Sequence, residues 1–250
     1  MEALERGRPA RLVWGGRDAR VPSRKAKQMA GKFVTFEGGE GTGKSTQAAL
    51  LANRLSGIGI GVLLTREPGG SPGAEIIRHV LLSGAAKRLG PNAEALLFAA
   101  ARADHLDTVI NPALRSEQWV ICDRFLDSTR VYQGIVGNVG LPFIRGLEKL
   151  TVGNSKPDLT FVLDLPAEIG LARARARRGD EAADRFENED LAYHQALNAA
   201  FRAIAEEEKQ RCMLIDASQP QEHIAAEIWQ AVCKRLNPEA ASLTLEEIAR

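Results

Sequence analysis

The chain has 250 residues, of which 44 % are hydrophobic and 26 % charged, and its formal net charge is +1. These values are typical of a soluble protein with one large or two small domains. The near-neutral charge gives no reason to expect nucleic acid as a partner. No stretch approaches ~18 apolar residues, so we expect no membrane span. The cysteines, Cys122, Cys212 and Cys233, form no CxxC pair or zinc pattern, which suits a reducing compartment such as the cytoplasm.

Residues 1–30 differ in composition from the rest. Between Met1 and Lys32 there are nine Lys or Arg and three acidic residues, without an apolar core that would indicate a secretory signal. Glu2, Glu5 and Asp18 argue against a transit peptide. We interpret 1–30 as a disordered basic extension, or as upstream sequence read through before a natural start at Met29. A nucleic-acid-binding tail would rest on charge alone.

From Lys32 onward, short apolar runs alternate with helical patterns. Strands are predicted at Phe33–Phe36, Val62–Thr65, Trp119–Cys122, Leu159–Leu163 and Met213–Ile215. Helices are predicted at Ser45–Leu55, Ala74–Leu82, Ala93–Leu114, Phe143–Val152, Ala167–Arg177, Asp190–Lys209 and Gln221–Leu236, with a short helix or frayed tail at Thr244–Ala249. This alternation predicts an α/β fold, a doubly wound parallel sheet of five strands flanked by helices. Leu236-Asn-Pro predicts a helix stop, and so a domain at 31–236 and a tail at 237–250.

A glycine-rich stretch joins the first predicted strand to the first predicted helix. Gly38 to Ser45 fits G-x-x-x-x-G-K-[ST], the P-loop pattern. Its glycines let the backbone wrap a polyphosphate, and the amides at the helix start point partial positive charge at it. The strand–helix context argues against a chance glycine-rich turn. The predicted ATP-binding residues are Gly38, Gly39, Glu40, Gly41, Thr42, Gly43, Lys44, Ser45 and Thr46.

Two further strands end on an arginine beside a carboxylate. The second strand leads into Arg66-Glu67, and the third leads into Asp123-Arg124. Ligands of this fold class bind at the carboxyl ends of the strands, where an arginine can bind a second phosphate and Asp123 can hold Mg²⁺. For either pair alone, a structural salt bridge would be the simpler interpretation. Two such pairs beside a P-loop favour a site that joins a phosphate donor to a phosphate acceptor.

An arginine-rich segment, Leu171-Ala-Arg-Ala-Arg-Ala-Arg-Arg-Gly179, runs into a charged stretch that ends at Glu187. Arg173 and Arg177 share a helix face, and Arg175 points elsewhere. We interpret residues 173–187 as a lid that brings guanidinium groups onto the transferring phosphoryl group. The alternatives are a solvated basic face, or a lid of which only one arginine reaches the phosphates.

Together these motifs resemble those of the thymidylate kinases. The resemblance rests on Thr65-Arg-Glu-Pro-Gly-Gly70, Phe98-Ala-Ala-Ala-Arg102, Cys122-Asp-Arg-Phe125, Ser128-Thr-Arg-Val-Tyr-Gln-Gly134 and Pro157-Asp-Leu-Thr160, in order between Gly31 and Leu236. The lid arginines, with no basic residue between Gly39 and Thr42, resemble the bacterial arrangement. The resemblance implies ATP- and Mg²⁺-dependent phosphorylation of dTMP to dTDP, a step of dTTP biosynthesis. It also implies a cytoplasmic homodimer, formed through apolar helix faces such as Ala93–Leu114 and Phe143–Val152.

The resemblance assigns roles on the acceptor side. Phe98 would stack on the thymine ring, and Tyr132 would crowd the 2′ position of the sugar, although both could be ordinary packing residues. The base would also contact Arg102 at a carbonyl, Gln133 at the N3 edge and Pro68 near the 5-methyl group. Arg78 and Arg124 would hold the acceptor phosphate, with Arg66 and Glu67 close by. Thr129 is also predicted to bind the substrate.

The resemblance also assigns roles around the transferred group. The predicted catalytic residues are Lys44, Asp123, Arg124, Arg173 and Arg177, and the candidates for the Mg²⁺ shell are Glu40, Ser45, Asp123 and Glu187. The turn from Asp216 to Pro220 would pass the adenine. Phe125 departs from the family pattern, which more often has Tyr or His there.

Two other functions remain open at this point. The chain could be another nucleoside monophosphate kinase or a deoxynucleoside kinase; the pair Arg78 and Arg124 favours a monophosphate acceptor over a nucleoside. It could also be a P-loop switch or regulatory ATPase. The guanine-reading Asn-Lys-x-Asp motif of GTPases is absent from the sequence.

Overall fold

The structure is a computed structural model that describes residues 31–179 and 185–238. The predicted basic extension at 1–30, the middle of the predicted lid and the possible final helix at Thr244–Ala249 lie outside the described residues. Within the described residues, no helix is both long and apolar enough to cross a bilayer.

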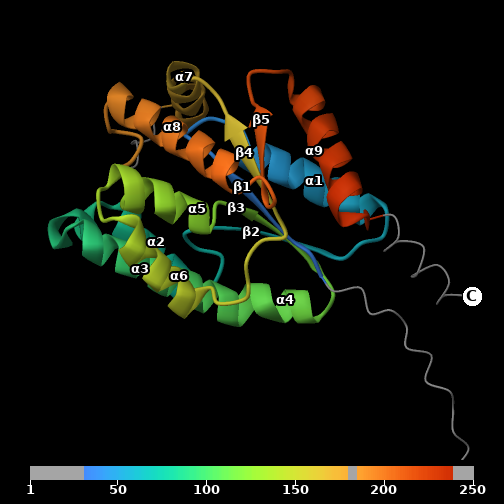
Figure 1. Ribbon diagram of the computed structural model, residues 1–250, viewed down its shortest axis with the longest axis horizontal. Helices are drawn as coiled ribbons and strands as arrows, with labels where there is room; N and C mark the ends of the chain where they lie inside the picture. Colours follow the sequence, from blue (N-terminus) through green and yellow to red (C-terminus); the bar gives the residue numbers. More distant parts are fainter. Residues whose placement is uncertain (1–30, 180–184, 239–250) are drawn as a thin grey trace, which may run out of the picture.

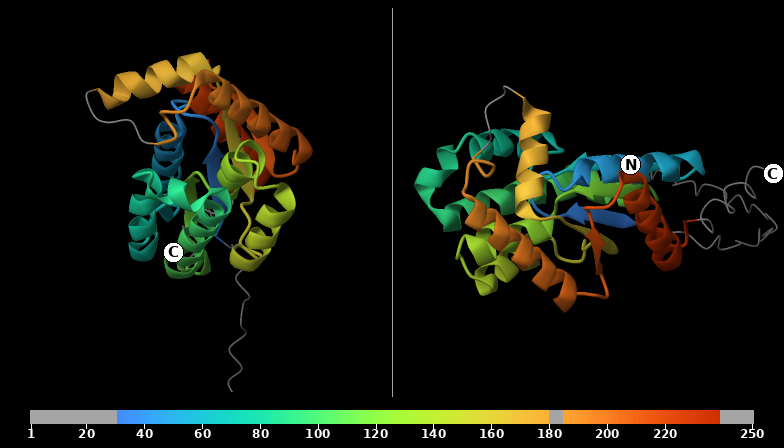
Figure 2. Two further views of the ribbon diagram at one scale, coloured as in Figure 1. Left: turned by 90° about the vertical axis from the view of Figure 1, so that its left-hand side faces the viewer. Right: turned by 90° about the horizontal axis from the view of Figure 1, so that it is seen from above.

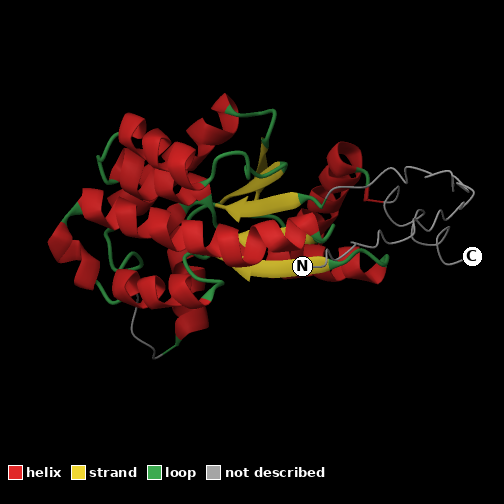
Figure 3. Cartoon of the chain, turned by 90° about the horizontal axis from the view of Figure 1, so that it is seen from below, coloured by secondary structure: helices red, strands yellow, loops and turns green. Residues whose placement is uncertain are grey.

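Within the described residues, five strands form a single sheet in the order β2-β3-β1-β4-β5. All neighbouring strands are parallel, and their arrows run the same way in Figure 3. The doubly wound fold predicted from the sequence is therefore confirmed. The strands are β1 (Phe33–Glu37), β2 (Val62–Arg66), β3 (Trp119–Asp123), β4 (Leu159–Asp164) and β5 (Cys212–Asp216).

Each strand continues one residue beyond its predicted carboxyl end, and the added residue is always charged. The apolar runs predicted strand ends too early because backbone pairing continues past them. Arg66 lies opposite Asp123, and Asp164 lies opposite Asp216. The five added side chains, Glu37, Arg66, Asp123, Asp164 and Asp216, make the carboxyl edge of the sheet a charged edge, as a ligand site requires.

Helices cover both faces of the sheet (Figure 1). The α-helices are α1 (Lys44–Gly57), α2 (Pro72–Leu82), α3 (Pro91–His105), α4 (Asn111–Arg115), α5 (Leu126–Thr129), α6 (Leu141–Thr151), α7 (Ala167–Arg178), α8 (Leu191–Glu207) and α9 (Gln221–Leu236). A short 3₁₀ helix, η1 (Ala85–Leu89), precedes α3, and two segments are π-helical: η2 (Leu106–Ile110) and η3 (Arg130–Val136).

The π-helical segments explain two differences from the predicted helices. The helix predicted at Ala93–Leu114 is present, but η2 widens it between α3 and α4. Pro112, which lies within α4, has no N–H to donate to the preceding turn, and such a residue favours a local change in helix pitch. The helix formed by α5 and η3 was not predicted, because its sequence has no sustained amphipathic period.

The core lies on both faces of the sheet. On one face, α1 and α9 pack against β1, β4 and β5 in a cluster that includes the ring pair Phe36 and Phe161, with centroids 5.4 Å apart. On the other face, α4, α5, η3 and α8 bury a second set of apolar side chains. The two layers hold the carboxyl ends of β1, β2 and β3 together, and the loops that leave these ends form the site.

Candidate active site

A cavity of about 260 Å³ lies at the carboxyl ends of β1, β2 and β3. Most of the residues predicted from the sequence line it, although they come from separate parts of the chain. These lining residues are Glu40, Gly41, Gly43, Lys44, Ser45, Thr46, Arg66, Glu67, Pro68, Arg78, Phe98, Arg102, Asp123, Arg124, Thr129, Tyr132, Gln133, Arg177 and Glu187. Four predicted residues lie outside its lining: Gly38, Gly39, Thr42 and Arg173.

The P-loop wraps around the Lys44 side chain at the start of α1. Lys44 is 7 % exposed, and its Nζ donates to the carbonyl oxygen of Gly39 at 2.6 Å. Burial, together with the nearby Arg124 cation, lowers the pKa of Lys44 to about 8, and the carboxylates of Glu40 and Asp123 offset part of this effect. A buried cation of this kind is stabilised when phosphate oxygens come near it.

The P-loop lies against the helix that begins the predicted lid. Gly41 has φ 66°, and a Cβ built on it would stand 2.0 Å from the carbonyl oxygen of Gly170 in α7. A Cβ on Gly170 would in turn stand 2.3 Å from the carbonyl oxygen of Glu40. Figure 2 shows α7 crossing close to the start of α1. Glycine is therefore required on both sides of the contact between the P-loop and α7.

Asp123 and Ser45 meet beside the P-loop. The Ser45 hydroxyl donates to Oδ2 of Asp123. The other carboxylate oxygen of Asp123, Oδ1, is buried and has no hydrogen-bond partner among the described residues. A buried carboxylate oxygen without a donor fits a cation or its water shell.

Arg124 has a backbone conformation that is unusual for a side chain of its size. Its φ is 67°, in the left-handed region. The guanidinium donates to the Gly38 carbonyl at 3.0 Å and to Oε1 of Glu40 at 2.6 Å, and it lies 5.2 Å from the ring centroid of Tyr132. Burial opposes the charge of Arg124, but Glu40 and other anionic groups outweigh burial and raise its pKa. Arg124 is therefore a fixed cation next to the P-loop.

Glu40 is held as an anion by the same contacts. Its Oε1 accepts hydrogen bonds from Arg124 and, at 2.8 Å, from the Tyr132 hydroxyl. Burial would raise the pKa of Glu40, but Arg124 and then Lys44 outweigh it and lower the pKa to about 2. Glu40 thus carries a full negative charge between two cations that are candidates for phosphate binding.

Arg102, which is predicted to contact the base, belongs to a buried network around Glu67. Arg102 is 3 % exposed; its Nε donates to Glu67 at 2.8 Å, and its Nη2 donates to Thr129 Oγ1 at 2.9 Å. His105 contacts the other oxygen of Glu67 at 3.2 Å, and Thr65 holds the far nitrogen of the imidazole at 2.8 Å. Glu67 therefore fixes the direction of the Arg102 guanidinium at the wall of the cavity.

Gln133 and three aromatic rings complete this side of the cavity. The Gln133 amide donates to Glu94 at 2.8 Å, and Glu94 also pairs with Arg185. Phe98 and Tyr132 both face Phe186, with centroid separations of 6.3 and 5.4 Å. Phe98, Tyr132 and Gln133 thus line one cavity, although their predicted roles stay predictions. Phe186 was not predicted, because it lies in a charged stretch that matches no motif.

Arg66 and Arg78 enter the cavity from β2 and α2. Arg66 pairs with Glu75 at 2.9 Å. Arg78 donates to the carbonyl oxygen of Pro68 at 2.7 Å. Both guanidinium groups are thus anchored at one end while their residues line the cavity.

Arg173 and Arg177, which the sequence placed on one helix face, both line a neighbouring cavity, and of the two Arg177 also lines the main one. Arg177 lies 3.9 Å from Glu187, whereas Arg173 donates to the Ala217 carbonyl at 3.1 Å. The neighbouring cavity, of about 320 Å³, lies between the P-loop and the turn after β5. Its lining residues are Gly41, Thr42, Gly43, Thr46, Gln47, Arg173, Arg177, Gln219, Gln221 and Ile224.

The chain matches known proteins over the part that builds this site. A family model described as thymidylate kinase matches residues 36–228. A thymidylate kinase of Bradyrhizobium diazoefficiens is 58 % identical over 213 residues, covering 85 % of this chain and 93 % of that protein. Another, of Nitrobacter winogradskyi, is 57 % identical over 219 residues, covering 87 % and 95 %. The crystal structure of thymidylate kinase from Ehrlichia chaffeensis superposes with a TM-score of 0.67 at 31 % identity, covering 81 % of this chain and 99 % of that one.

The chain belongs to the thymidylate kinase family. Thymidylate kinases transfer a phosphoryl group from ATP to dTMP and release dTDP. The two cavities share the P-loop residues Gly41, Gly43 and Thr46 in their linings, which agrees with an enzyme that must hold two nucleotides at once.

Several groups of this thymidylate kinase site were not found from the sequence. Leu82, Phe125, Ser128 and Phe186 line the main cavity. Glu37 lies just beneath it, at the end of β1. Ser128 and Phe125 belong to a motif that was recognised, so their proximity could have been inferred, whereas the position of Glu37 next to them depends on strand pairing.

The residues present fit a magnesium ion with few protein ligands. Among the described residues, no three His, Cys, Asp or Glu side chains gather as a metal cluster. Mg²⁺ in phosphoryl-transfer enzymes commonly takes one or two protein oxygens and completes its shell with water and phosphate. Ser45 and Asp123 offer those oxygens. Glu40 is held by Arg124 and Tyr132, and Glu187 pairs with Arg178, so both are less available.

Proposed function

We propose that this chain phosphorylates dTMP to dTDP with ATP and Mg²⁺, and that the residues of the two cavities have the roles predicted from the sequence. The observation that carries the proposal is the union, in one cavity, of a P-loop lysine, a fixed cation at Arg124 and a base-binding group around Arg102 and Gln133. A simple ATPase or switch has no need for the last two.

In this proposal the acceptor phosphate attacks the γ-phosphorus of ATP in line. An oxygen of the dTMP phosphate is already an anionic nucleophile, so the protein needs no general base. Lys44 and Arg177 stabilise the negative charge that spreads over the transferring group, and Arg124 positions the acceptor phosphate. Mg²⁺, held through Ser45 and Asp123, would neutralise charge on the donor phosphates.

The acceptor base would lie between Phe98 and the Arg102 network. Phe98 offers a ring face for stacking, and Arg102 presents a guanidinium whose Nε and Nη2 are already fixed by Glu67 and Thr129. Gln133 offers its amide to the N3 edge of thymine. The Tyr132 hydroxyl, fixed by Glu40, lies between the phosphate and base regions, where it would limit space at the sugar.

We also propose that the chain acts as a homodimer in the cytoplasm. Support for the homodimer comes from exposed apolar side chains on the adjoining helices α2, α3 and α6. Ile76 is 71 % exposed, Leu96 49 % and Leu150 83 %. Support for the compartment comes from the three cysteines, which are free thiols.

The direct test is an ADP-release assay with Mg²⁺-ATP and a panel of acceptors: dTMP, dUMP, UMP, CMP, AMP and thymidine, with a blank that lacks an acceptor. We expect release that is fastest with dTMP and negligible in the blank. Equal release without an acceptor would identify an ATPase, and preference for another monophosphate would overturn the assignments of Phe98, Arg102 and Gln133.

A further inference from the structure

Glu37 is a fully buried carboxylate that belongs to none of the sequence motifs used above. It is the last residue of β1, directly before the P-loop, and its side chain is 0 % exposed. Its Oε1 accepts hydrogen bonds from the backbone N–H of Phe125 at 2.8 Å and of Ser128 at 3.2 Å. Its Oε2 accepts from the Ser128 hydroxyl at 2.6 Å. All three donors belong to one short segment, the turn from Phe125 to Ser128 that follows Arg124.

This turn determines where Arg124 points. Arg124 has φ 67°, a conformation that costs a non-glycine residue of the order of 1 kcal/mol or more unless its surroundings enforce it. Its backbone N–H donates to Phe36 at 2.8 Å, which fixes the residue on one side. Glu37 fixes the next residue, Phe125, on the other side. Arg124 Nη1 also lies 3.4 Å from the hydroxyl of Ser128, so Ser128 links Glu37 to the guanidinium itself.

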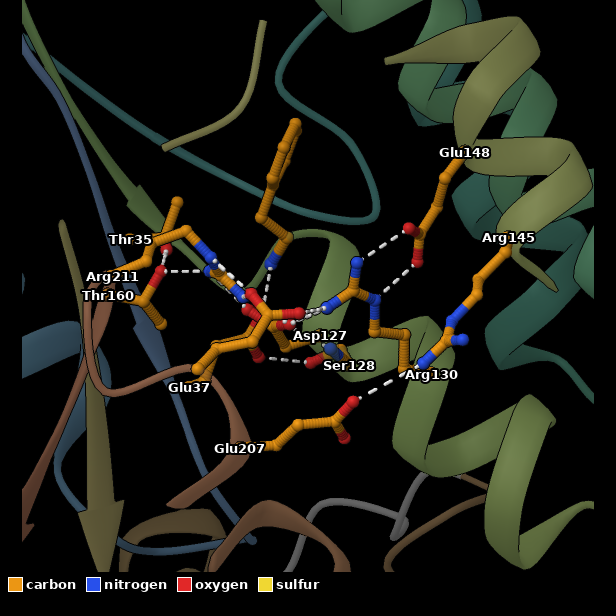
Figure 4. A network of polar contacts seen from close by, with 12 residues as sticks. Thr35, Glu37, Asp127, Ser128, Arg130, Arg145, Glu148, Thr160, Glu207 and Arg211 are labelled. Atoms are coloured by element: carbon orange, nitrogen blue, oxygen red, sulfur yellow. Dashed lines mark hydrogen bonds and ion pairs between the residues drawn. The ribbon is translucent and has the colours of Figure 1, made fainter. Parts of the chain in front are cut away.

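A second set of contacts holds the same turn from behind (Figure 4). Asp127 is buried between Arg130, at 3.2 Å, and Arg211, at 2.7 Å. Arg130 is bound in turn by both oxygens of Glu148, at 2.6 and 2.7 Å. These arginines pair with Asp127, whose charge lies near Glu37; burial, and then this charge, raise the pKa of the Glu37 carboxyl.

We propose that Glu37 is a positioning residue for phosphoryl transfer, which holds the Phe125–Ser128 turn so that the Arg124 guanidinium is fixed where the acceptor phosphate binds. Glu37 itself touches neither nucleotide in this scheme. Its effect on the reaction passes through Arg124, and the proposal rests on the proposed function only in that Arg124 contacts the acceptor. The rear network of Asp127, Arg130 and Arg211 keeps the turn in register with β4 and β5.

A double-mutant cycle separates positioning from a general structural role. We expect Glu37→Ala to lower kcat/KM for the acceptor by about 10²-fold, the loss typical of a misplacement near 1 Å. If Glu37 acts through Arg124, the same substitution in an Arg124→Ala background should change kcat/KM by no more than about twofold, within the usual error of additivity. Equal losses in the two backgrounds, or wild-type kinetics in Glu37→Ala, would overturn the proposal.

Further variants distinguish loss of the hydrogen bonds of Glu37 from general disturbance of the fold. Glu37→Gln retains an acceptor for the two backbone amides and an N–H₂ for the Ser128 hydroxyl, so its kcat/KM should stay within about tenfold of wild type. Glu148→Gln disturbs the rear network without contacting the turn, and its loss should combine additively with that of Arg124→Ala. If Glu37→Ala does not fold, Ser128→Ala replaces it in the cycle, with the same expected non-additivity and the same overturning result.

The cycle is run with whichever acceptor the wild-type protein phosphorylates fastest. An acceptor other than dTMP would correct the proposed function, while the additivity of Glu37 and Arg124 would still be measured. Failure of the proposed dTMP kinase activity is therefore distinguishable from failure of the proposed positioning role of Glu37.

Discussion

Lys44 shows at the scale of one residue how function and stability can oppose each other. Its ammonium group is buried, and burial lowers its pKa to about 8. A lowered pKa for a cation means that the folded protein disfavours the charged form relative to the unfolded chain. The charge is kept in an unfavourable place, where only a bound polyphosphate would compensate it fully.

Replacing Lys44 should affect turnover and stability in opposite directions. Lys44→Met should lose nearly all turnover, by at least about 10³-fold, because a fixed cation at the transferring group is removed. At pH 7 the same variant should unfold at an equal or higher temperature than wild type, because it no longer buries a charge. Steady-state kinetics and calorimetric melting of the nucleotide-free protein measure the two effects. Normal turnover would refute the role of Lys44, and a marked fall in melting temperature would refute the physical account.

Glu37 leads to a prediction of pH dependence. Burial, and then the neighbouring charge of Asp127, raise the pKa of Glu37 from 4.5 to about 7, while Ser128 and Arg124 act in the opposite direction. The carboxyl therefore binds its proton more tightly in the folded state. Its contribution to stability is complete below about pH 4.5 and is lost as the pH rises toward 7. The total change is of the order of 3 kcal/mol, from about 1.4 kcal/mol per pKa unit.

Glu37→Gln provides the matched control for this pH dependence. The free energy of unfolding of the wild type, minus that of the variant, should fall between pH 5 and pH 7.5 and stay level above it. Urea unfolding at a series of pH values gives this difference and cancels the titration of other carboxylates. A difference that is constant with pH, or that rises, would show that Glu37 is charged throughout the range.

Among the contacts between elements, the one between the P-loop and α7 leaves the least room for side chains. Gly41 and Gly170 approach so closely that neither position has room for a Cβ. The helix that carries Arg173 and Arg177 is thereby seated directly on the loop predicted to hold the donor phosphates. The position of the lid arginines therefore depends on a backbone-to-backbone contact.

Gly170→Ala should weaken the donor side selectively. A Cβ at 2.3 Å from the Glu40 carbonyl must displace α7 or the P-loop, and kcat/KM for ATP should fall by about 10²-fold. Binding of dTMP alone, measured by calorimetry, should change little, because the acceptor residues lie on other elements. Gly57→Ala at the far end of α1 is the matched control, since a Cβ there meets nothing within 4 Å. That variant should keep wild-type kinetics and gain up to about 1 kcal/mol of helix stability. If both variants had the same kcat/KM for ATP, the contact between the P-loop and α7 would not be needed for the donor side.

At the scale of the whole molecule, the order of the elements and the type of sheet could be predicted from the sequence. Buried parallel strands give continuous apolar runs such as Trp119–Cys122, which are easy to recognise. The charged residue that ends each strand could not be assigned this way, because its place in the sheet comes from pairing with a neighbour. Asp123 was identified through its motif, whereas Glu37, which has no motif of its own, was missed.

In the candidate site too, residues that belong to a motif could be predicted from the sequence, whereas the residues that contact them could not. Residues carried by recognised motifs, such as Arg102 and Gln133, were brought into the cavity as predicted, though their roles stay predictions. The partners that fix them were not predicted. Glu67 lies between Arg102 and His105, and Glu94 accepts a hydrogen bond from Gln133. Such pairs join segments distant in the chain, and a single sequence carries no signal for them.

The homodimer gives a prediction for the whole assembly. Replacing Leu150 with Glu on α6 should convert a dimer into a monomer, because it places a charge on an apolar side chain that is 83 % exposed in the single chain. Sedimentation velocity of both proteins at equal concentration measures the change. Ile169→Glu on α7, where the side chain is 43 % exposed and lies on another element, is the control that should leave the mass unchanged. A wild-type monomer would refute the proposed homodimer.

The π-helical segment η3 makes the acceptor side sensitive to chain length. A π-helix contains one more residue per hydrogen-bonded turn than an α-helix. Loss of a single residue between Thr129 and Tyr132 would remove the extra residue and let the backbone relax to ordinary α-helical bonding, which would move Tyr132 and Gln133 relative to the cavity that they line. We therefore expect a deletion of one codon here to disturb the residues predicted to bind thymine in a protein that still folds.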